Sequence, residues 1–366
     1  MKRLAAGLAG ILMLTACAAG PEATPVPTQQ ATPEPVQTAL PSPTPEPQGP
    51  AVRTDWSKLE PREKAGAVGK RWYAAYTDRL VPLDYGGDLV PYAGLRLMDD
   101  WPSTEGGGCL YGLMTLDGIV VVDPVYSRVI RLSWDRWWER DPAHVLPMLA
   151  LCVGEQVTDG DGYWAEDRYA FAAADGAWTT EAKYWNYAVS AEGVFASWEE
   201  GCELLSADGA VVRGWTWAEL GYSKDDPAPF SASEISLTIE WLDGLVLLEE
   251  NEEQARVLDT ATGELTTLTR EDWWRHRDGE GEHQWPEGRL DPYSGRTYTV
   301  QGDIFDGPMV LLDGDGNELA RIERPGWYSS LKLVGGLVER LDRDTATYTD
   351  LDGNVVFRRM LSLGEE

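Results

Sequence analysis

The chain has 366 residues, with 61 acidic against 31 basic side chains and a formal net charge of -30. Such a charge repels phosphate backbones and anionic lipid surfaces, so we expect no nucleic-acid partner. With 43 % hydrophobic residues, 17 Trp and 15 Tyr, the chain has enough apolar material for a packed core, and disorder along its whole length is excluded.

Residues 1–16 have the organisation of a signal peptide. Two basic residues precede an apolar stretch at 4–14, which is too short to span a bilayer. The stretch runs into the sequence LTAC at 14–17, which resembles a bacterial lipobox. The resemblance implies cleavage before Cys17 and acylation of that residue, which gives a lipoprotein anchored to the outer face of the cell membrane. The alternative is ordinary signal peptidase cleavage near Cys17, which would release the protein.

Residues 17–52 alternate Pro with Thr, Gln, Ala and Glu. Such a composition cannot bury a core and favours extended polyproline II segments. We therefore expect a disordered stalk between the lipid anchor and a folded domain at 53–366.

Within that domain, short apolar runs rich in Val, Leu, Tyr and Trp alternate with turn dipeptides from about residue 90 onward. Asp-Gly between two such runs is a strong hairpin signal, and a further apolar strand precedes most of these hairpins. Units of three or four strands at this spacing predict an all-β fold, a β-propeller of about six blades. A strand at 80–83 would then close the ring with the last unit. The six turns are Asp117-Gly118, Asp175-Gly176, Asp208-Gly209, Thr262-Gly263, Asp315-Gly316 and Asp352-Gly353.

One hairpin carries a family resemblance. The sequence YGLMTLDGIVVVDPVY at 111–126 is similar to a WG repeat, in which an aromatic-Gly pair opens a strand and Asp-Gly makes the turn. Tyr111 stands where the repeat usually has Trp. The resemblance implies an all-β repeat array in an exported protein, and it implies no reaction and no catalytic residue.

Three segments combine a Ser or Thr with a Trp-rich polar stretch and predict short capped helices between units. They begin at Ser133, Thr216 and Thr269, and Thr216 has capping-box spacing to Glu219.

Motifs for catalysis and metal binding do not emerge from the sequence. The three histidines, at 144, 276 and 283, lack zinc-site spacing, so we expect no metal site. The segments 159–162 and 313–317 alternate oxygen ligands as calcium prefers, but neither continues as an EF-hand loop. We interpret 313–317 as a hairpin turn, with weak calcium binding as the alternative, and expect no other cofactor.

Three cysteines lie within the predicted domain, at 109, 152 and 202. We expect buried thiols, and a disulfide between Cys109 and Cys152 is the alternative, because the extracytoplasmic side permits it.

Tryptophans among abundant carboxylates suggest a sugar-binding surface, because sugar rings stack on aromatic faces. Trp137, Trp138, Trp273 and Trp274 lie in polar contexts and are the candidate ligand-binding residues; packing between blades is the alternative role. We therefore expect a non-enzymatic binding or scaffolding module for a cell-wall glycan or protein partner. A glycosidase-like enzyme acting on polysaccharide is the second hypothesis, although nothing selects its two carboxylates. A sensor domain for the state of the envelope is the third.

Overall fold

In the computed structural model, the chain divides after Gln48 into a first unit and a second unit, Gly49–Glu366. The structure describes residues 79–96, 109–134, 138–153, 155–158, 163–166, 168–222, 240–279, 283–303 and 307–361, all of which belong to the second unit. The predicted signal peptide, Cys17, the stalk, Trp137 and the first calcium-like segment lie outside these ranges.

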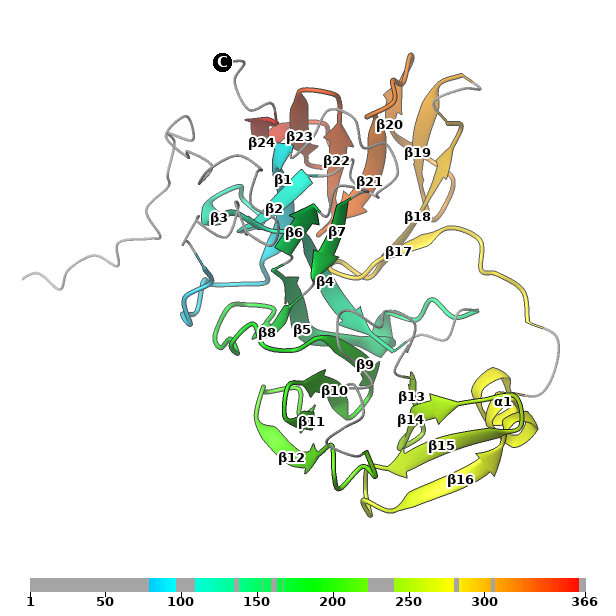
Figure 1. Ribbon diagram of the computed structural model, residues 1–366. Coiled ribbons are helices and arrows are strands. Elements are labelled where there is room, and N and C mark those ends of the chain that lie inside the picture. The colour runs from blue at the N-terminus through cyan, green and yellow to red at the C-terminus, as the bar shows by residue number, and fades with distance from the viewer. Residues whose placement is uncertain are drawn as a thin grey trace, which may run out of the picture. The chain divides into compact units, whose positions relative to one another are not determined.

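The described part is all-β, as predicted, and its main sheets are six antiparallel sheets of three or four strands that follow one another along the chain (Figure 1). The first sheet consists of β1 (Val90–Arg96), β2 (Cys109–Met114) and β3 (Val120–Tyr126). The second consists of β4 (Arg128–Ser133), β5 (Val145–Cys152) and β8 (Tyr169–Ala173). Between β5 and β8, a separate hairpin pairs β6 (Glu155–Thr158) with β7 (Tyr163–Glu166).

The other four sheets have four strands each, with every strand next to its neighbour in sequence. The third contains β9 (Asn186–Ser190), β10 (Gly193–Trp198), β11 (Gly201–Leu205) and β12 (Val211–Thr216). The fourth contains β13 (Glu240–Leu242), β14 (Leu245–Glu250), β15 (Gln254–Asp259) and β16 (Leu265–Thr269). The fifth contains β17 (Arg289–Asp291), β18 (Arg296–Gln301), β19 (Met309–Asp313) and β20 (Glu318–Ile322). The sixth contains β21 (Ser330–Val334), β22 (Leu337–Leu341), β23 (Thr345–Thr349) and β24 (Val355–Met360).

All six predicted turns are confirmed, and they occupy equivalent places. Each joins the last two strands of its sheet, except that the Asp175-Gly176 turn leads from β8 into a segment held by two isolated bridges, at Thr179 and Tyr184. The glycine of every turn has a positive φ between 79° and 85°, which explains why the sequence places glycine there.

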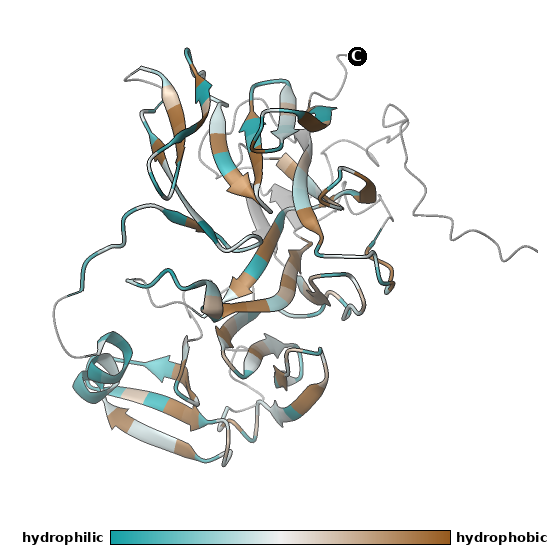
Figure 2. Cartoon of the chain, turned by 180° about the vertical axis from the view of Figure 1, so that it is seen from behind, coloured by the Kyte–Doolittle hydropathy of each residue, from teal (hydrophilic) through white to brown (hydrophobic). Residues whose placement is uncertain are grey.

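Apolar side chains shared between sheets form the core. Helix α1, by contrast, is largely hydrophilic (Figure 2). In the described part, hydrophobic clusters join most pairs of consecutive sheets. The fourth and fifth sheets share no such cluster among the described residues, and residues 279–288 lie between them in the sequence. One residue from each sheet illustrates each shared cluster. The pairs are Leu110 with Leu151 for the first and second sheets, Phe171 with Val194 for the second and third, Phe195 with Trp241 for the third and fourth, and Leu311 with Leu331 for the fifth and sixth. Six sheets that follow one another along the chain, most of them packed on the next, give a β-propeller-like domain.

The first and sixth sheets also pack against each other. Tyr92 and Tyr348 belong to one cluster, the Tyr348 hydroxyl accepts a 2.7 Å hydrogen bond from the Ala93 backbone N–H, and Arg359 donates to the Gly94 carbonyl at 2.9 Å. The predicted closing strand at 80–83 is wrong. That segment is not a strand, and the Leu83 backbone N–H donates at 2.9 Å to Gly176, beside the second sheet.

Of the three predicted helices, α1 (Arg270–Asp278) forms. At Thr216 the capping box is present: the Thr216 N–H donates to Glu219 at 2.8 Å, and the Glu219 N–H donates to the Thr216 hydroxyl at 3.3 Å. The chain makes a single turn there, so the prediction of a helix is wrong. Ser133 is the last residue of β4 rather than a helix cap, and residues 135–137 lie outside the described part.

Candidate functional site

The four tryptophans predicted to bind a ligand lie in different surroundings. Trp138 follows β4 and stacks on His283, with ring centroids 3.8 Å apart and an interplanar angle of 7°. Trp273 and Trp274 belong to α1, which follows the fourth sheet, and Trp137 lies outside the described residues. The tryptophans that can be placed therefore come from segments beside two different sheets.

Trp273 corrects the expectation of an exposed aromatic pair. The helix begins at Thr269, whose hydroxyl accepts a 3.1 Å hydrogen bond from the Asp272 backbone N–H, and it ends at Gly279, which has a φ of 69°. In this register Trp273 points towards the fourth sheet and is fully buried. It shares a cluster with Leu247, Ala255 and Val257. A fully buried ring has no face available to a sugar, so Trp273 has the packing role.

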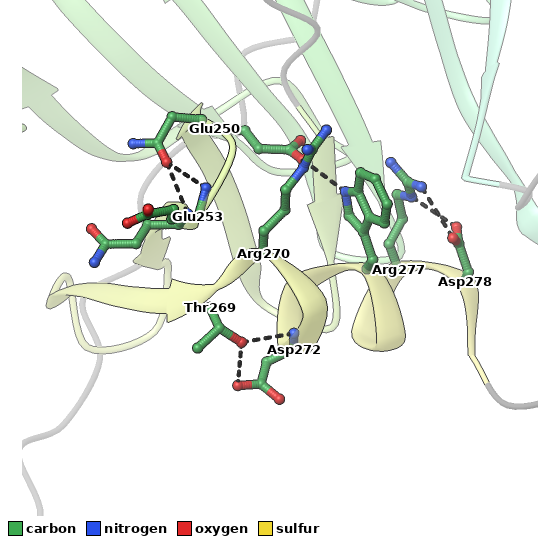
Figure 3. Close-up of polar contacts among 10 residues, drawn as sticks. Glu250, Glu253, Thr269, Arg270, Asp272, Arg277 and Asp278 are labelled. Atoms are coloured by element: carbon green, nitrogen blue, oxygen red, sulfur yellow. Dashed lines mark hydrogen bonds and ion pairs between the residues drawn. The ribbon is translucent and has the colours of Figure 1, made fainter.

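Trp274, one residue later, is 39 % exposed but closely surrounded by charged groups. Its indole N–H donates to Glu250 at 2.7 Å, and Arg270 donates to the same carboxylate oxygen at 2.7 Å (Figure 3). The Arg270 guanidinium lies 4.2 Å from the ring centroid and that of Arg277 lies 5.6 Å away, while Arg277 also pairs with Asp278. These contacts tie α1 to β14 and place cations over the indole, as in cation–π pairs.

The most exposed large aromatic side chains of the described part are two other tryptophans. Trp285 is 71 % exposed and Trp327 is 65 % exposed. Trp285 lies just before β17 and Trp327 lies between β20 and β21, so the two flank the first and last strands of the fifth sheet. Sequence reasoning missed both because it favoured tryptophans near a Ser or Thr cap. The available signal was a Trp beside Pro or Gly in a polar loop, as in Trp285-Pro286 and Gly326-Trp327.

The register of the fifth sheet places these tryptophans at one end of it. Gln301, the last residue of β18, pairs with Val310, and Met309, the first residue of β19, pairs with Ile322 at the end of β20. In β17, Arg289 pairs with Tyr298, so the residues before Arg289 run towards the level of Gln301. The segments that carry Trp285 and Trp327 therefore leave the sheet at the same end. We call these segments, residues 283–288 and 323–329, the tryptophan end of the fifth sheet.

The buried carboxylate of Asp291 has a structural role. Asp291 is buried and accepts hydrogen bonds from the backbone N–H groups of Tyr293, Gly335 and Gly336 and from the Ser294 hydroxyl. It thereby holds the β21–β22 turn of the sixth sheet against the fifth.

Two further carboxylates each combine a lysine with a tyrosine. Glu203 lies 2.8 Å from Lys183 and accepts from the Tyr184 hydroxyl at 2.7 Å. Burial, with the Glu203 carboxylate, raises the pKa of Tyr184 well above its usual value, so Tyr184 remains a donor.

Glu339, in the sixth sheet, is buried, lies 3.0 Å from Lys332 and accepts from the Tyr348 hydroxyl at 2.5 Å. Burial alone would lower the pKa of Lys332, but the neighbouring Glu339 carboxylate raises it above its usual value. Lys332 therefore stays protonated over the ordinary pH range.

Cys109, Cys152 and Cys202 are buried thiols, as expected, and the alternative disulfide does not form. Burial raises the pKa of Cys202 well above its usual value, which makes it unreactive.

The segment 313–317 forms the predicted hairpin turn between β19 and β20. The Asp313 carboxylate accepts from the Asp315 and Asn317 backbone N–H groups at 3.0 and 2.8 Å and from the Asn317 side chain at 3.0 Å. Among the described residues, no group of three or more His, Cys, Asp or Glu side chains could hold a metal ion.

Within the same residues, no helix has the length and apolar character needed to span a bilayer.

No protein-family model and no curated protein matches this chain. Apo AztD from Citrobacter koseri is 11 % identical, with 69 % of this chain and 67 % of that chain covered and a TM-score of 0.25. BamB from Moraxella catarrhalis is 13 % identical, with 64 % and 87 % covered and a TM-score of 0.17. The β-propeller domain of Cps50 (Swd1) from Myceliophteria thermophila is 9 % identical, with 64 % and 73 % covered and a TM-score of 0.20. At these values, neither the fold nor the function of this chain rests on the similarity.

Proposed function

We propose that this protein is a lipid-anchored extracytoplasmic lipoprotein whose β-propeller-like domain is a non-enzymatic binding module for a component of the cell envelope. The observation that carries the proposal is the exposure of Trp285 and Trp327 at one end of a single sheet. Tryptophan is enriched among the residues that carry most of the binding energy at interaction surfaces. The lipobox-like LTAC at 14–17 and the Pro-rich stalk at 17–52 would hold this domain near the envelope.

The WG-repeat resemblance of β2 and β3 supports an exported repeat protein. Gly112 stands where the repeat has its glycine, and a Cβ added there would lie 2.3 Å from the Val122 carbonyl oxygen and 2.5 Å from the Tyr92 ring. The aromatic-Gly pair thus has a physical reason in this chain, because another strand approaches too closely for any side chain.

The anchor is tested by Cys17→Ser. We expect the unchanged protein in the membrane fraction and the variant in the soluble extracytoplasmic fraction, because the acylated cysteine is removed. Retention of the variant in membranes would refute the lipoprotein assignment while leaving the binding module untouched.

The binding role is tested with the full chain, purified in mild detergent and mixed with insoluble envelope material. Protein in the pellet and reducing sugar in the supernatant are measured in the same samples. We expect retention without sugar release. Sugar release would replace the module with a polysaccharide-acting enzyme, and failure to be retained would refute the envelope ligand.

A further inference from the structure

We infer that the tryptophan end of the fifth sheet binds a neutral glycan chain through Trp285 and Trp327. This inference rests on the proposed binding function and names its ligand. It also moves the expected contact away from Trp273 and Trp274, which pack within the fourth-sheet region.

The geometry suits an extended ligand. The two tryptophans flank β17 and β20, the outermost strands of the fifth sheet, and both lie beyond the same end of it. Three interstrand spacings separate these strands, a distance of about 14 Å. A chain of several sugar rings is long enough to pass both of these strands, whereas a monosaccharide is not.

The chemistry of the two side chains suits a sugar. An indole presents a wide, planar apolar face, and a pyranose ring has an apolar C–H face bordered by hydroxyl groups. Trp285 is 71 % and Trp327 is 65 % exposed, so most of each side chain is accessible without rearrangement of the core. Rigid aromatic side chains also lose little conformational entropy on binding, which makes them effective contact residues.

The local charges favour a neutral ligand over a charged one. The whole chain carries -30, but the described residues of the tryptophan end and of the adjoining strand termini include both signs: Glu287, Asp303 and Glu323 are acidic, and Arg289 and Arg324 are basic. A mixed field attracts neither a polyanion nor a basic peptide strongly. It does offer hydrogen-bond donors and acceptors for hydroxyl groups. Binding to a neutral glycan should accordingly change little with ionic strength.

The test measures retention of the full chain, in mild detergent, on insoluble chitin, cellulose and peptidoglycan stripped of anionic polymers. We expect saturable retention on chitin or cellulose, changed less than about twofold between low salt and 0.5 M NaCl. Trp285→Ala and Trp327→Ala should each weaken it roughly tenfold, and the double variant should abolish it. Trp274→Ala is the matched control, because it removes a partly exposed tryptophan from helix α1, beside another sheet, and its retention should equal that of the unchanged protein.

The outcomes separate this inference from the proposed function. If the double variant is retained as well as the unchanged protein, the tryptophan end is not the binding site, although the proposed binding function stands. Retention on crude envelope material but on neither chitin nor cellulose, the two neutral glycans, would overturn the ligand class and point to a protein or an anionic polymer. Retention on nothing would overturn both. Thermal melting confirms folding of each variant, and the two single variants keep the test valid if the double variant is unstable.

Discussion

At the scale of single residues, neighbouring positions with the same amino acid can have opposite roles. Trp273 is buried in the core whereas Trp274 is partly exposed beside Arg270, because consecutive helical residues point about 100° apart. The sequence identified the aromatic pair and its Thr269 cap, but the side that would face the sheet depended on packing. Trp285 and Trp327 were missed for a similar reason, since exposure is decided by which loops other segments cover.

Gly112 gives a prediction at this scale. Gly112→Ala places a methyl group against the Val122 carbonyl oxygen and the Tyr92 ring, so strand or ring must move. We expect the free energy of unfolding to fall by about 2 kcal/mol, measured by denaturant titration. Gly214→Ala, another strand glycine, is the control, because its Cβ would find its nearest neighbour at 3.7 Å. Equal effects of the two substitutions would show that close packing is not the reason for the glycine.

At the scale of elements, hairpins were predictable and helices were less so. Each turn is specified locally, by a glycine at positive φ and a side chain that accepts backbone N–H groups, so six dipeptides identified six turns. A capping box is also local, but a helix must continue beyond it. After Thr216 the chain turns once and stops, whereas after Thr269 the helix is continued by Trp273 packing on the fourth sheet.

The two turns with the sequence Asp-x-Asp-Gly-Asn predict a dependence on acid. Hydrogen bonds from Asn317 hold the pKa of Asp313 below its usual value, and those from Asn354 do the same for Asp350. A carboxyl whose pKa is lowered by folding stabilises the protein above the unfolded-state pKa, near 4. That contribution is lost as the pH falls through the lower, folded-state pKa.

We therefore expect the double variant Asp313→Ala/Asp350→Ala to lose less stability than the unchanged protein between pH 5 and pH 2.5, measured as the shift in melting temperature. Acid also neutralises the other carboxylates, and this changes the stability of both proteins. The difference between their melting-temperature shifts therefore reports the contribution of the two turns. Asp315→Ala, which alters charge in the same turn but keeps the Asp313 carboxylate, should retain the full dependence on acid. Parallel curves for all three proteins would rule out this role of the two aspartates.

At the scale of the whole domain, the all-β architecture and the number of sheets followed from the repeat of hairpins. The way in which the first and last sheets meet did not. A closing strand at 80–83 was expected, but the sheets are joined by the side chains of Tyr348 and Arg359 on the backbone of β1. Contacts between residues more than 250 positions apart leave no periodic signal, so sequence patterns did not show them.

Tyr348 tests this contact. Tyr348→Phe leaves the Ala93 N–H without its acceptor and removes a donor from Glu339, both in buried surroundings. We expect a loss of about 2 kcal/mol in unfolding free energy and faster amide hydrogen exchange in β1. Tyr222→Phe is the control, since it removes one hydrogen bond to the Leu248 carbonyl in another part of the domain. Unchanged exchange in β1 would mean that the first and sixth sheets are held together by other contacts.

The binding of a glycan without its cleavage is tested most directly by titrating the full chain with soluble neutral oligosaccharides. Tryptophan fluorescence reports binding, and chromatography of the same samples reports whether the sugar chain remains whole. We expect a saturable change in fluorescence with every oligosaccharide recovered intact. Unchanged fluorescence across the series would contradict glycan binding, and the appearance of shortened oligosaccharides would contradict a non-enzymatic module.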